Sequence, residues 1–233
     1  MIVGIDYSIN SPGVCILNDT GIHFGTLARN HVAKPEFFET LRNYNVHTWD
    51  HARYKAIGNS TIDAQGFTND AMQQAIALSE MCKTMNIGKG DTEENIAIFE
   101  GFSFGSKGNR LAQLAGYQYV ARSQMIQTLI NHNGLYVYAP QSVKSVAGAA
   151  KRGEGKVGMI QRFLDHEDKL PGLEEHPFYI EMSKNHDSIL RKKPTKRKPI
   201  GDWCKPVDDI VDAYWIVYTY LIKEGIDIHS LRQ

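Results

Sequence analysis

The length, composition and charge of the chain indicate one globular domain with elaborations, or at most two small domains. Its 233 residues, 42% of them hydrophobic, are enough for a substantial core, and the formal net charge is zero. The three cysteines form no C-x-x-C pair, which argues against a disulfide framework or a structural zinc site and favours a reducing cytoplasm. No signal peptide is recognisable and the longest apolar run, AYWIVYTYLI, is too short to span a bilayer, so we expect a soluble, cytoplasmic protein without a membrane partner.

The first predicted elements form a strand meander. The runs IVGIDYS and GVCILN, separated by the turn INSPG, predict a β-hairpin, and GIHFGTLA predicts a third strand. Residues 30–66 have no clean period, although FFETLRNY fits a short helix. The segment TNDAMQQAIALSEMCKTMN has helical apolar spacing, with Thr68 or Asn69 as the N-cap. A short buried strand, NIAIFEG, then ends on Glu100.

Helices dominate the remainder of the chain. GNRLAQLAGYQYVARSQMIQTLINHNG predicts a long helix closed by Asn133-Gly134, LYVYAP predicts a strand, and QSVKSVAG and KVGMIQRFL predict helices. Residues 165–205 are polar and Pro-rich and predict an insertion or a mobile loop. DDIVDAYWIVYTYLIKEG predicts the last helix. This order predicts an α/β fold with a mixed five-stranded β-sheet flanked by α-helices.

Three predicted elements carry acids where apolar residues are expected. Asp6 lies on the first strand, Glu100 ends a later strand, and Asp208, Asp209 and Asp212 begin the last helix. The helix dipole explains first-turn acids such as Asp208, but Asp212 lies a full turn further on. For any one buried acid, a hydrogen-bonded structural carboxylate is the simpler interpretation. Acids from three elements that meet would repel one another unless a cation joined them.

Hard oxygen ligands of this kind suit Mg²⁺, with Mn²⁺ as a substitute. Four carboxylates that hold two such ions about 4 Å apart can support in-line phosphodiester hydrolysis. We therefore predict a metal-binding and catalytic set formed by Asp6, Glu100, Asp209 and Asp212, with Asp6 bridging both ions.

The zero net charge hides an uneven distribution. From Phe102 to Leu164 there are eight Lys or Arg against the single acid Glu154, whereas residues 1–100 hold twelve acids and seven bases. A basic middle region is typical of a face that binds a polyanion. An unevenly charged solvated surface explains the same counts equally well.

These residues carry a resemblance to a known family. In order, GIDYS, FEG with NRLAQLAG, PQSVKSVAGAAKRGEGKVGM and DDIVDAY resemble the motifs of RuvC-type Holliday junction resolvases, which have the RNase H-like (retroviral integrase-like) fold. The stretch EGFSFGSKGN is especially similar to phage-encoded members, which would act in a bacterial host cytoplasm. The resemblance covers most of one domain over residues 1–233. It leaves out about 30–90 and 165–205, which are expected to be insertions.

The resemblance places the family's acids on Asp6, Glu100, Asp209 and Asp212, and a one-residue ambiguity leaves Asp208 as the alternative to Asp209 as ligand. It places the family's lysines on Lys144 and Lys156, although the spacing before Lys156 is looser than in the family. It implies a homodimer that grips a four-way DNA junction and nicks two strands symmetrically, leaving 5′-phosphate ends.

Further basic and polar residues are candidates for DNA contacts. GFSFGSKGNR follows Glu100 directly and offers backbone amides and cations to phosphates, although it also fits an ordinary loop with Asn109 as N-cap. KRGEGK is Gly-rich and basic. RKKPTKRK fits either a DNA-contacting arm or a solvated loop. The predicted DNA-binding residues are Ser8, Ser103, Lys107, Asn109, Arg110, Lys144, Lys151, Arg152 and Lys156.

Two other functions remain open at this stage. Another RNase H-like nuclease, acting on flaps, single strands or RNA–DNA hybrids, would need the same acids. GIDYSINSPGV also loosely resembles the first phosphate loop of the sugar kinase, Hsp70 and actin superfamily, but a second phosphate loop and an adenosine loop are missing and the chain is about half the length required. The first alternative is therefore the stronger one.

Overall fold

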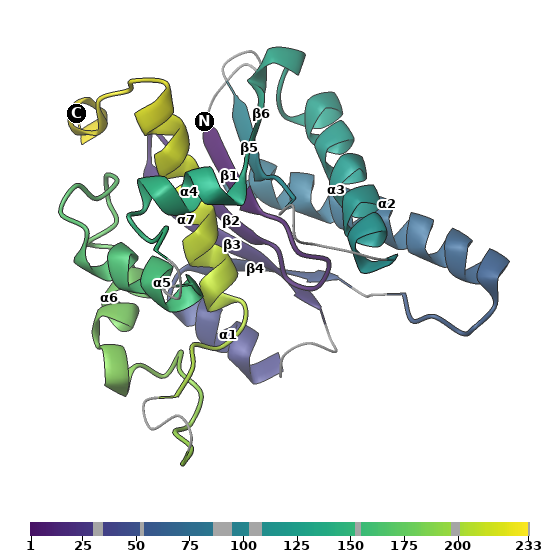
Figure 1. The fold of residues 1–233 in the computed structure, drawn as a ribbon, viewed down its shortest axis with the longest axis horizontal. Coiled ribbons are helices and arrows are strands. Elements are labelled where there is room, and N and C mark those ends of the chain that lie inside the picture. The colour runs from purple at the N-terminus through teal and green to yellow at the C-terminus, as the bar shows by residue number, and fades with distance from the viewer. Residues whose placement is uncertain are drawn as a thin grey trace.

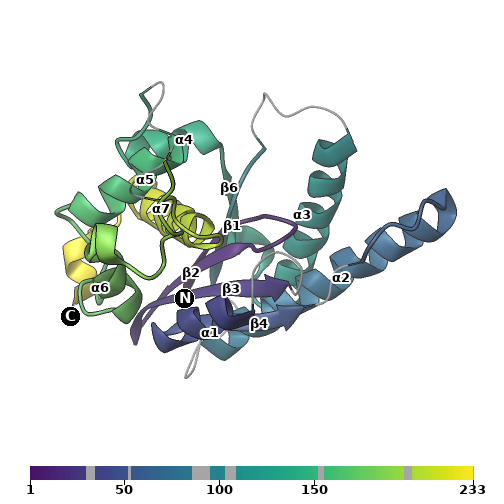
Figure 2. The same cartoon turned by 90° about the horizontal axis from the view of Figure 1, so that it is seen from below.

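One mixed β-sheet runs through the molecule, with helices on both faces (Figures 1 and 2). The computed structural model describes residues 1–29, 35–51, 54–85, 95–102, 109–151, 155–196 and 201–232. Within these ranges the sheet has six strands in the order β4-β3-β2-β1-β5-β6. The strands are β1 (Ile2–Asp6), β2 (Gly13–Asn18), β3 (Gly21–Arg29), β4 (Val46–His51), β5 (Ile96–Glu100) and β6 (Leu135–Tyr138).

The strand pairing confirms the predicted meander and adds a sixth strand. β1, β2 and β3 pair antiparallel, while β5 pairs parallel with β1 and β6 pairs parallel with β5. The prediction of five strands was wrong, because β4 pairs parallel with β3 at the sheet edge. Its sequence, VHTWDH, contains mostly polar residues, so it lacks the apolar alternation that identifies a strand from sequence.

Helices cover the two faces of the sheet unequally. In Figure 2, α2 and α3 lie on one side of the sheet and α4, α5, α6 and α7 on the other. The helices are α1 (Pro35–Asn43), α2 (Ser60–Met85), α3 (Asn109–Thr128), α4 (Pro140–Val146), α5 (Gly155–Asp165), α6 (Pro177–Ser183) and α7 (Val207–Lys223). Short 3₁₀ helices span His132–Gly134, Asn185–Asp187 and Ile228–Arg232. No helix in these described ranges has the length and apolar character needed to cross a bilayer.

The alternation of β1 decides which side chains reach which face. Val3 and Ile5 are fully buried in the core formed with α2 and α3. Their neighbours Gly4 and Asp6 face the opposite side, since successive side chains of a strand alternate. Asp6 therefore lies on the face that α7 covers.

Two glycines allow α7 to lie unusually close to this face. A Cβ added to Gly4 would lie 2.5 Å from the carbonyl oxygen of Ala213. A Cβ added to Gly13, which pairs with Asp6 across the hairpin, would overlap the carbonyl of Asp209. The absence of side chains at these positions sets the height of α7 above the end of β1.

Two local predictions differ from the structure. The helix α2 begins at Ser60, not at Thr68 or Asn69, and the side chain of Asn59 accepts a hydrogen bond from Ile62 N at its start. Polar residues in its first turns concealed this longer helix. The segment predicted as a polar insertion or mobile loop contains α6 and contributes buried core side chains at Leu170, Leu173, Phe178, Met182 and Leu190. These apolar residues are separated by prolines and charges, so they show no period.

Candidate metal centre

Three carboxylates from two elements meet beside the end of β1. Asp6 is its last residue, and Asp209 and Asp212 lie in the first two turns of α7. One oxygen from each carboxylate belongs to a group whose atoms all lie within 4.8 Å of one another. Asp209 is buried, whereas Asp6 and Asp212 are half-buried and line a cavity of about 400 Å³. The geometry thus favours Asp209 over Asp208 as the first acid of the helix pair.

Glu100 lines the same cavity from the neighbouring strand. β5 runs parallel to β1, so the carboxyl ends of the two strands lie side by side. The carboxylate of Glu100 is not in the close group of three. Its backbone carbonyl accepts a hydrogen bond of 2.6 Å from Gln118 Nε2 on α3, which ties the end of β5 to the opposite layer.

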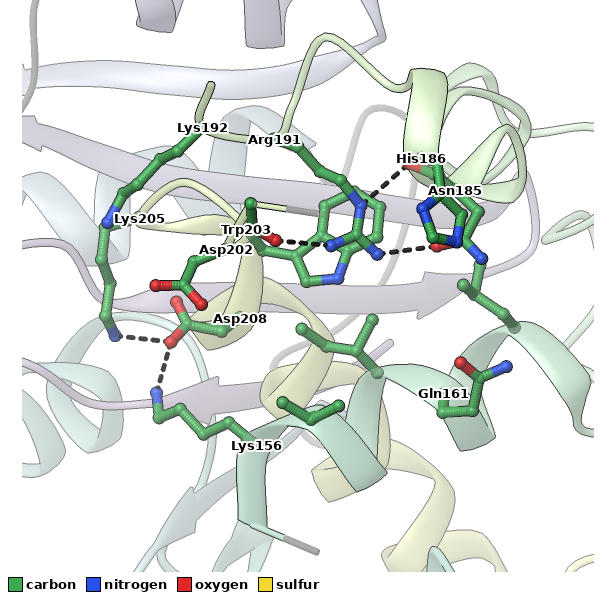
Figure 3. A pocket seen from close by; sticks show the side chains of 14 residues that line it. Lys156, Gln161, Asn185, His186, Arg191, Lys192, Asp202, Trp203, Lys205 and Asp208 are labelled. Atoms are coloured by element: carbon green, nitrogen blue, oxygen red, sulfur yellow. Dashed lines mark hydrogen bonds and ion pairs between the residues drawn. The ribbon is translucent and has the colours of Figure 1, made fainter. Parts of the chain in front are cut away.

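Two lysines neutralise part of this negative charge. Lys156 Nζ lies 2.8 Å from Asp208 Oδ2, 3.0 Å from Asp209 Oδ1 and 3.8 Å from Asp212 Oδ2. Lys205 Nζ lies 3.1 Å from Asp208 Oδ2 and also contacts Asp209 Oδ1. Figure 3 shows both ammonium groups reaching the same carboxylate oxygen of Asp208. The lysine side chains remain about half exposed, so they border the cavity as well as the acids.

Proximity and burial shift the protonation of these acids. Burial, followed by repulsion from Asp212, Asp209 and Glu100, raises the pKa of Asp6 well above its ordinary value. Burial and the charge of Asp212 raise the pKa of Glu100 to about 7. Burial raises the pKa of Asp212 to about 6, although Lys156 opposes this shift. Without a further cation, the cluster therefore retains protons near neutral pH.

The lysine-paired groups shift the other way. Burial alone would raise the pKa of Asp208, but Lys156 and Lys205 outweigh burial and lower it. Burial alone would lower the pKa of Lys156, but Asp209, Asp212 and Asp208 together raise it. Both groups are therefore charged at neutral pH, and Asp208 serves to hold the two lysines beside the cluster.

The residues present fit a divalent metal ion. Asp209 Oδ2 is buried and has no hydrogen-bond partner within the described ranges. A buried carboxylate oxygen without a donor is costly, and a hard cation would satisfy it. The close group consists of oxygen donors alone, which suits Mg²⁺ or Mn²⁺ better than a softer metal. Asp6, Asp209 and Asp212 are therefore the residues best placed to hold such an ion.

The predicted DNA-binding residues are only partly gathered at this cavity. Ser8, Lys144 and Lys156 line it, and Ser8 Oγ accepts a hydrogen bond from Ser11 N that shapes the β1–β2 turn. Lys151 is exposed and is not among the residues that line it. Asn109 and Arg110 begin α3, but their side chains are outside the described part of the structure, as are Ser103, Lys107 and Arg152.

Sequence reasoning missed several residues of this site. Lys205 was not predicted, although its position four residues before Asp209 at the start of a helix was a usable signal. Gln118 and Gln74 were not predicted either, and their side-chain amides donate hydrogen bonds to backbone carbonyls beside the site. Gln74 Nε2 donates to the carbonyls of Ser8 and Ile9 and holds the β1–β2 turn from the α2 side. Buried glutamines of this kind have no sequence signature.

Comparison with known proteins finds similarity in structure only. No protein-family model and no curated protein sequence matches the chain. The yeast mitochondrial Holliday junction resolvase Ydc2 aligns over 99% of this chain and 81% of its own, with 13% identity and a TM-score of 0.52.

Two structures of Thermus thermophilus RuvC, one of them in complex with a Holliday junction substrate, align over 97% of this chain and 96% of their own. Their identities are 9% and 10%, and their TM-scores 0.45 and 0.44. At such identities the similarity concerns the fold. The six-stranded mixed sheet, with its antiparallel β1–β3 meander and flanking helices, is the RNase H-like fold found in Holliday junction resolvase structures.

Proposed function

We propose that this chain is a divalent-metal-dependent endodeoxyribonuclease that resolves four-way and related branched DNA junctions by phosphodiester hydrolysis. The observation that supports it most is the group of three carboxylates at the end of β1, on an RNase H-like sheet similar to that of the yeast resolvase. Structural acids alone would not need a cation, whereas this group leaves a buried oxygen without a partner among the described residues. The proposal identifies the cluster as the catalytic centre.

In this proposal, Asp6 is the central ligand, and Glu100, Asp209 and Asp212 complete the set. When two divalent ions are bound at such a cluster, the chemistry they supply is activation of a water and stabilisation of the leaving 3′-oxygen. The half-exposed ammonium of Lys156 borders the acids, and Lys144 lines the same cavity. These lysines attract the DNA backbone and orient the scissile phosphate toward the carboxylates.

The proposed assembly is a homodimer, because the described part of one protomer holds a single carboxylate cluster of this kind and resolution of a four-way junction needs two nicks. Each protomer would cut one strand, and symmetric cleavage would leave 5′-phosphate ends. Sedimentation of the chain with a cleavage-resistant junction would show two protomers per DNA. A stable complex with one protomer per junction would contradict this stoichiometry.

The function is tested by cleavage of four labelled substrates: a four-way junction, a flap, a linear duplex and an RNA–DNA hybrid. We expect paired nicks in the junction with Mg²⁺ or Mn²⁺ and no product in EDTA. Preferential cutting of the flap or the hybrid would instead support another RNase H-like nuclease. Absence of metal-dependent cleavage on all four substrates would reject both nuclease hypotheses.

A further inference from the structure

A second cavity, of about 470 Å³, adjoins the carboxylate cluster and is formed largely by the segment that the resolvase motifs do not cover. It lies between α5 and residues 185–192 and 201–205 (Figure 3). Lys156 and Lys205 line both this cavity and the one that holds the acids. A ligand at the cluster could therefore continue into the second cavity without leaving the two lysines.

One wall of this cavity is a fixed stack of two planar groups. The guanidinium of Arg191 lies 3.9 Å from the ring centroid of Trp203. Its nitrogens donate to Asn185 O at 2.8 Å, Asn185 Oδ1 at 2.7 Å and Gly201 O at 3.0 Å. Because four groups hold the guanidinium, the planar wall is formed before any ligand arrives, which lowers the entropic cost of binding.

The opposite wall is apolar and comes from α5. Val157, Ile160 and Leu164 occupy this side, and Val157 is 77% exposed at the rim. Together, the planar Arg191–Trp203 stack and the aliphatic side chains of α5 form a slot, in which a flat group can pack on both of its faces. Such slots accept flat aromatic ligands, because both ligand faces lose contact with water.

The charges around the slot favour an anion. Four cationic side chains line the cavity, namely Lys156, Arg191, Lys192 and Lys205, against the two carboxylates of Asp202 and Asp208. A flat aromatic group joined to an anionic backbone is a nucleotide. The volume lies within the range of small-molecule sites, so it admits an unstacked nucleotide but not a duplex.

We propose that this cavity, the base pocket, binds an unpaired nucleobase of the DNA strand whose phosphate lies at the carboxylate cluster. The base enters between the Arg191–Trp203 wall and the apolar side chains of α5, and Lys192 and Lys205 contact its flanking phosphates. Bases stack on aromatic and guanidinium planes regardless of their sequence, so the pocket selects unpaired strands rather than a base order. This inference rests on the proposed function, since it takes the strand at the cluster to be DNA.

Binding of short oligonucleotides in EDTA tests the base pocket independently of cleavage. The probes are a fluorescent pentathymidylate and a pentamer of the same charge whose central nucleotide is abasic. Stacking of one base contributes about 1–3 kcal/mol, so the full chain should bind the abasic probe about five- to 150-fold more weakly. Equal affinity for the two probes would overturn the proposal.

Substitutions test whether the preference for the probe with the base arises in the base pocket. Val157→Asp changes an exposed rim residue and should weaken pentathymidylate binding at least about fivefold, while the matched variant Ile222→Asp, at the far end of α7, should not. Trp203→Ala should remove the preference for the probe with the base, and Trp203→Phe should restore most of it. Equal losses for Val157→Asp and Ile222→Asp, with both chains folded by circular dichroism, would overturn the proposal.

Competition in the same binding assay separates a base pocket from a peptide site, and a cleavage assay tests the nuclease proposal separately. A polyglutamate peptide of equal charge should compete poorly, because it has no base to stack; stronger competition than by pentathymidylate would identify a peptide site and reject the base pocket. Failure of the nuclease proposal is read separately, as absence of metal-dependent cleavage by the wild-type chain. If the wild-type chain binds pentathymidylate more tightly than the abasic probe but cuts no substrate, the base pocket would be supported and the nuclease proposal rejected.

Discussion

Buried carboxylates lie on both faces of the sheet, and their partners differ. On the α2 side, Asp70 is 6% exposed and accepts hydrogen bonds from Tyr117 OH at 2.5 Å and Tyr54 N at 3.1 Å. On the α7 side, Asp209 is 3% exposed, yet its Oδ2 has no partner in the described part of the chain and its near neighbours include two other carboxylates. Within the described ranges, both of these donors to Asp70 are neutral, as is common for a structural acid. The α7 acids instead need cations, so the kind of partner, more than burial, separates the two classes.

The largest expected effect comes from Asp6→Asn. The substitution removes one of three mutually repelling carboxylates, so the metal-free chain should be at least as stable as the wild type. Cleavage of a four-way junction with Mg²⁺ should fall about a thousandfold or more, because metal stabilisation of the reaction contributes several kcal/mol. A gel cleavage assay and thermal unfolding in EDTA measure the two effects.

The matched control is Asp70→Asn on the other face. It replaces charge-assisted hydrogen bonds with weaker ones, so the free energy of unfolding should fall by about 1–3 kcal/mol while the folded chain keeps its cleavage rate. The distinction between the two acids would be lost if Asp6→Asn cleaved normally. It would also be lost if Asp70→Asn abolished cleavage without reducing stability.

The next largest effect concerns the height of α7 above the sheet. Gly13→Ala places a methyl group where the carbonyl of Asp209 lies, so α7 must move away from β1. Overpacking of this kind costs about 1–3 kcal/mol of unfolding free energy, and the spread carboxylates should bind Mg²⁺ more weakly. Chemical denaturation and calorimetric titration with Mg²⁺ provide the two measurements.

Gly116→Ala controls for the general effect of replacing a glycine. Gly116 lies within α3, and a Cβ there would meet nothing within 4 Å. Alanine should therefore stabilise the chain by about 0.5–1 kcal/mol through its higher helix propensity and leave Mg²⁺ affinity unchanged. If Gly13→Ala behaved like Gly116→Ala, the close approach of α7 would not position the acids.

The acids that line the cavity could be singled out from sequence, because each interrupts a regular apolar pattern. Asp6 and Glu100 stand out on β1 and β5, and Asp212 lies a full turn inside an otherwise apolar helix. The β1–β3 meander, β5 and the helices α3 and α7 followed from the same periodicities. The glycines at positions 4 and 13 also lay in strand patterns, where glycine signals a close backbone approach.

The remaining features depend on tertiary contacts that leave no periodic trace. β4 is held by pairing with β3, and its polar residues resemble a loop. Arg191 and Trp203 are brought together by a single antiparallel bridge. The segment between them is Pro-rich and has no strand pattern, so their stacking could not be predicted from sequence. Lys205 reaches Asp209 only because α7 begins just after it.

A smaller effect is the coupling of metal binding to protons. The folded chain raises the pKa of Asp212 to about 6 and of Glu100 to about 7, so both carboxyls hold protons more tightly than in the unfolded chain. Their contribution to metal-free stability is therefore present below the unfolded pKa values and is lost as the pH rises through about 6 to 7. Ligation requires the ionised forms, so Mg²⁺ binding near pH 6 should release about one to two protons.

Calorimetry in buffers of different ionisation enthalpy counts the released protons. The contribution of Asp212 and Glu100 should fall toward zero above about pH 8, where these two carboxyls are already ionised. Asp212→Asn should reduce the release near pH 6, whereas Asp70→Asn should leave it unchanged. Binding without proton release in the wild-type chain at pH 6 would contradict the shared burial of these acids.

The smallest expected effect comes from comparing a lysine beside the carboxylate cluster with a lysine beside another buried acid. Lys205 pairs with Asp208 and Asp209 beside the cluster, whereas Lys184 pairs at 2.6 Å with Glu181, a buried acid that also accepts from Ile189 N. Lys205→Met removes a cation that competes with a metal ion, so Mg²⁺ affinity without DNA should rise by up to about fivefold, in keeping with the modest energy of half-exposed ion pairs. Lys184→Met should lower stability and leave Mg²⁺ affinity unchanged, because Glu181 has its own donors. Equal Mg²⁺ affinities for the two variants would mean that Lys205 does not occupy the position a metal would take.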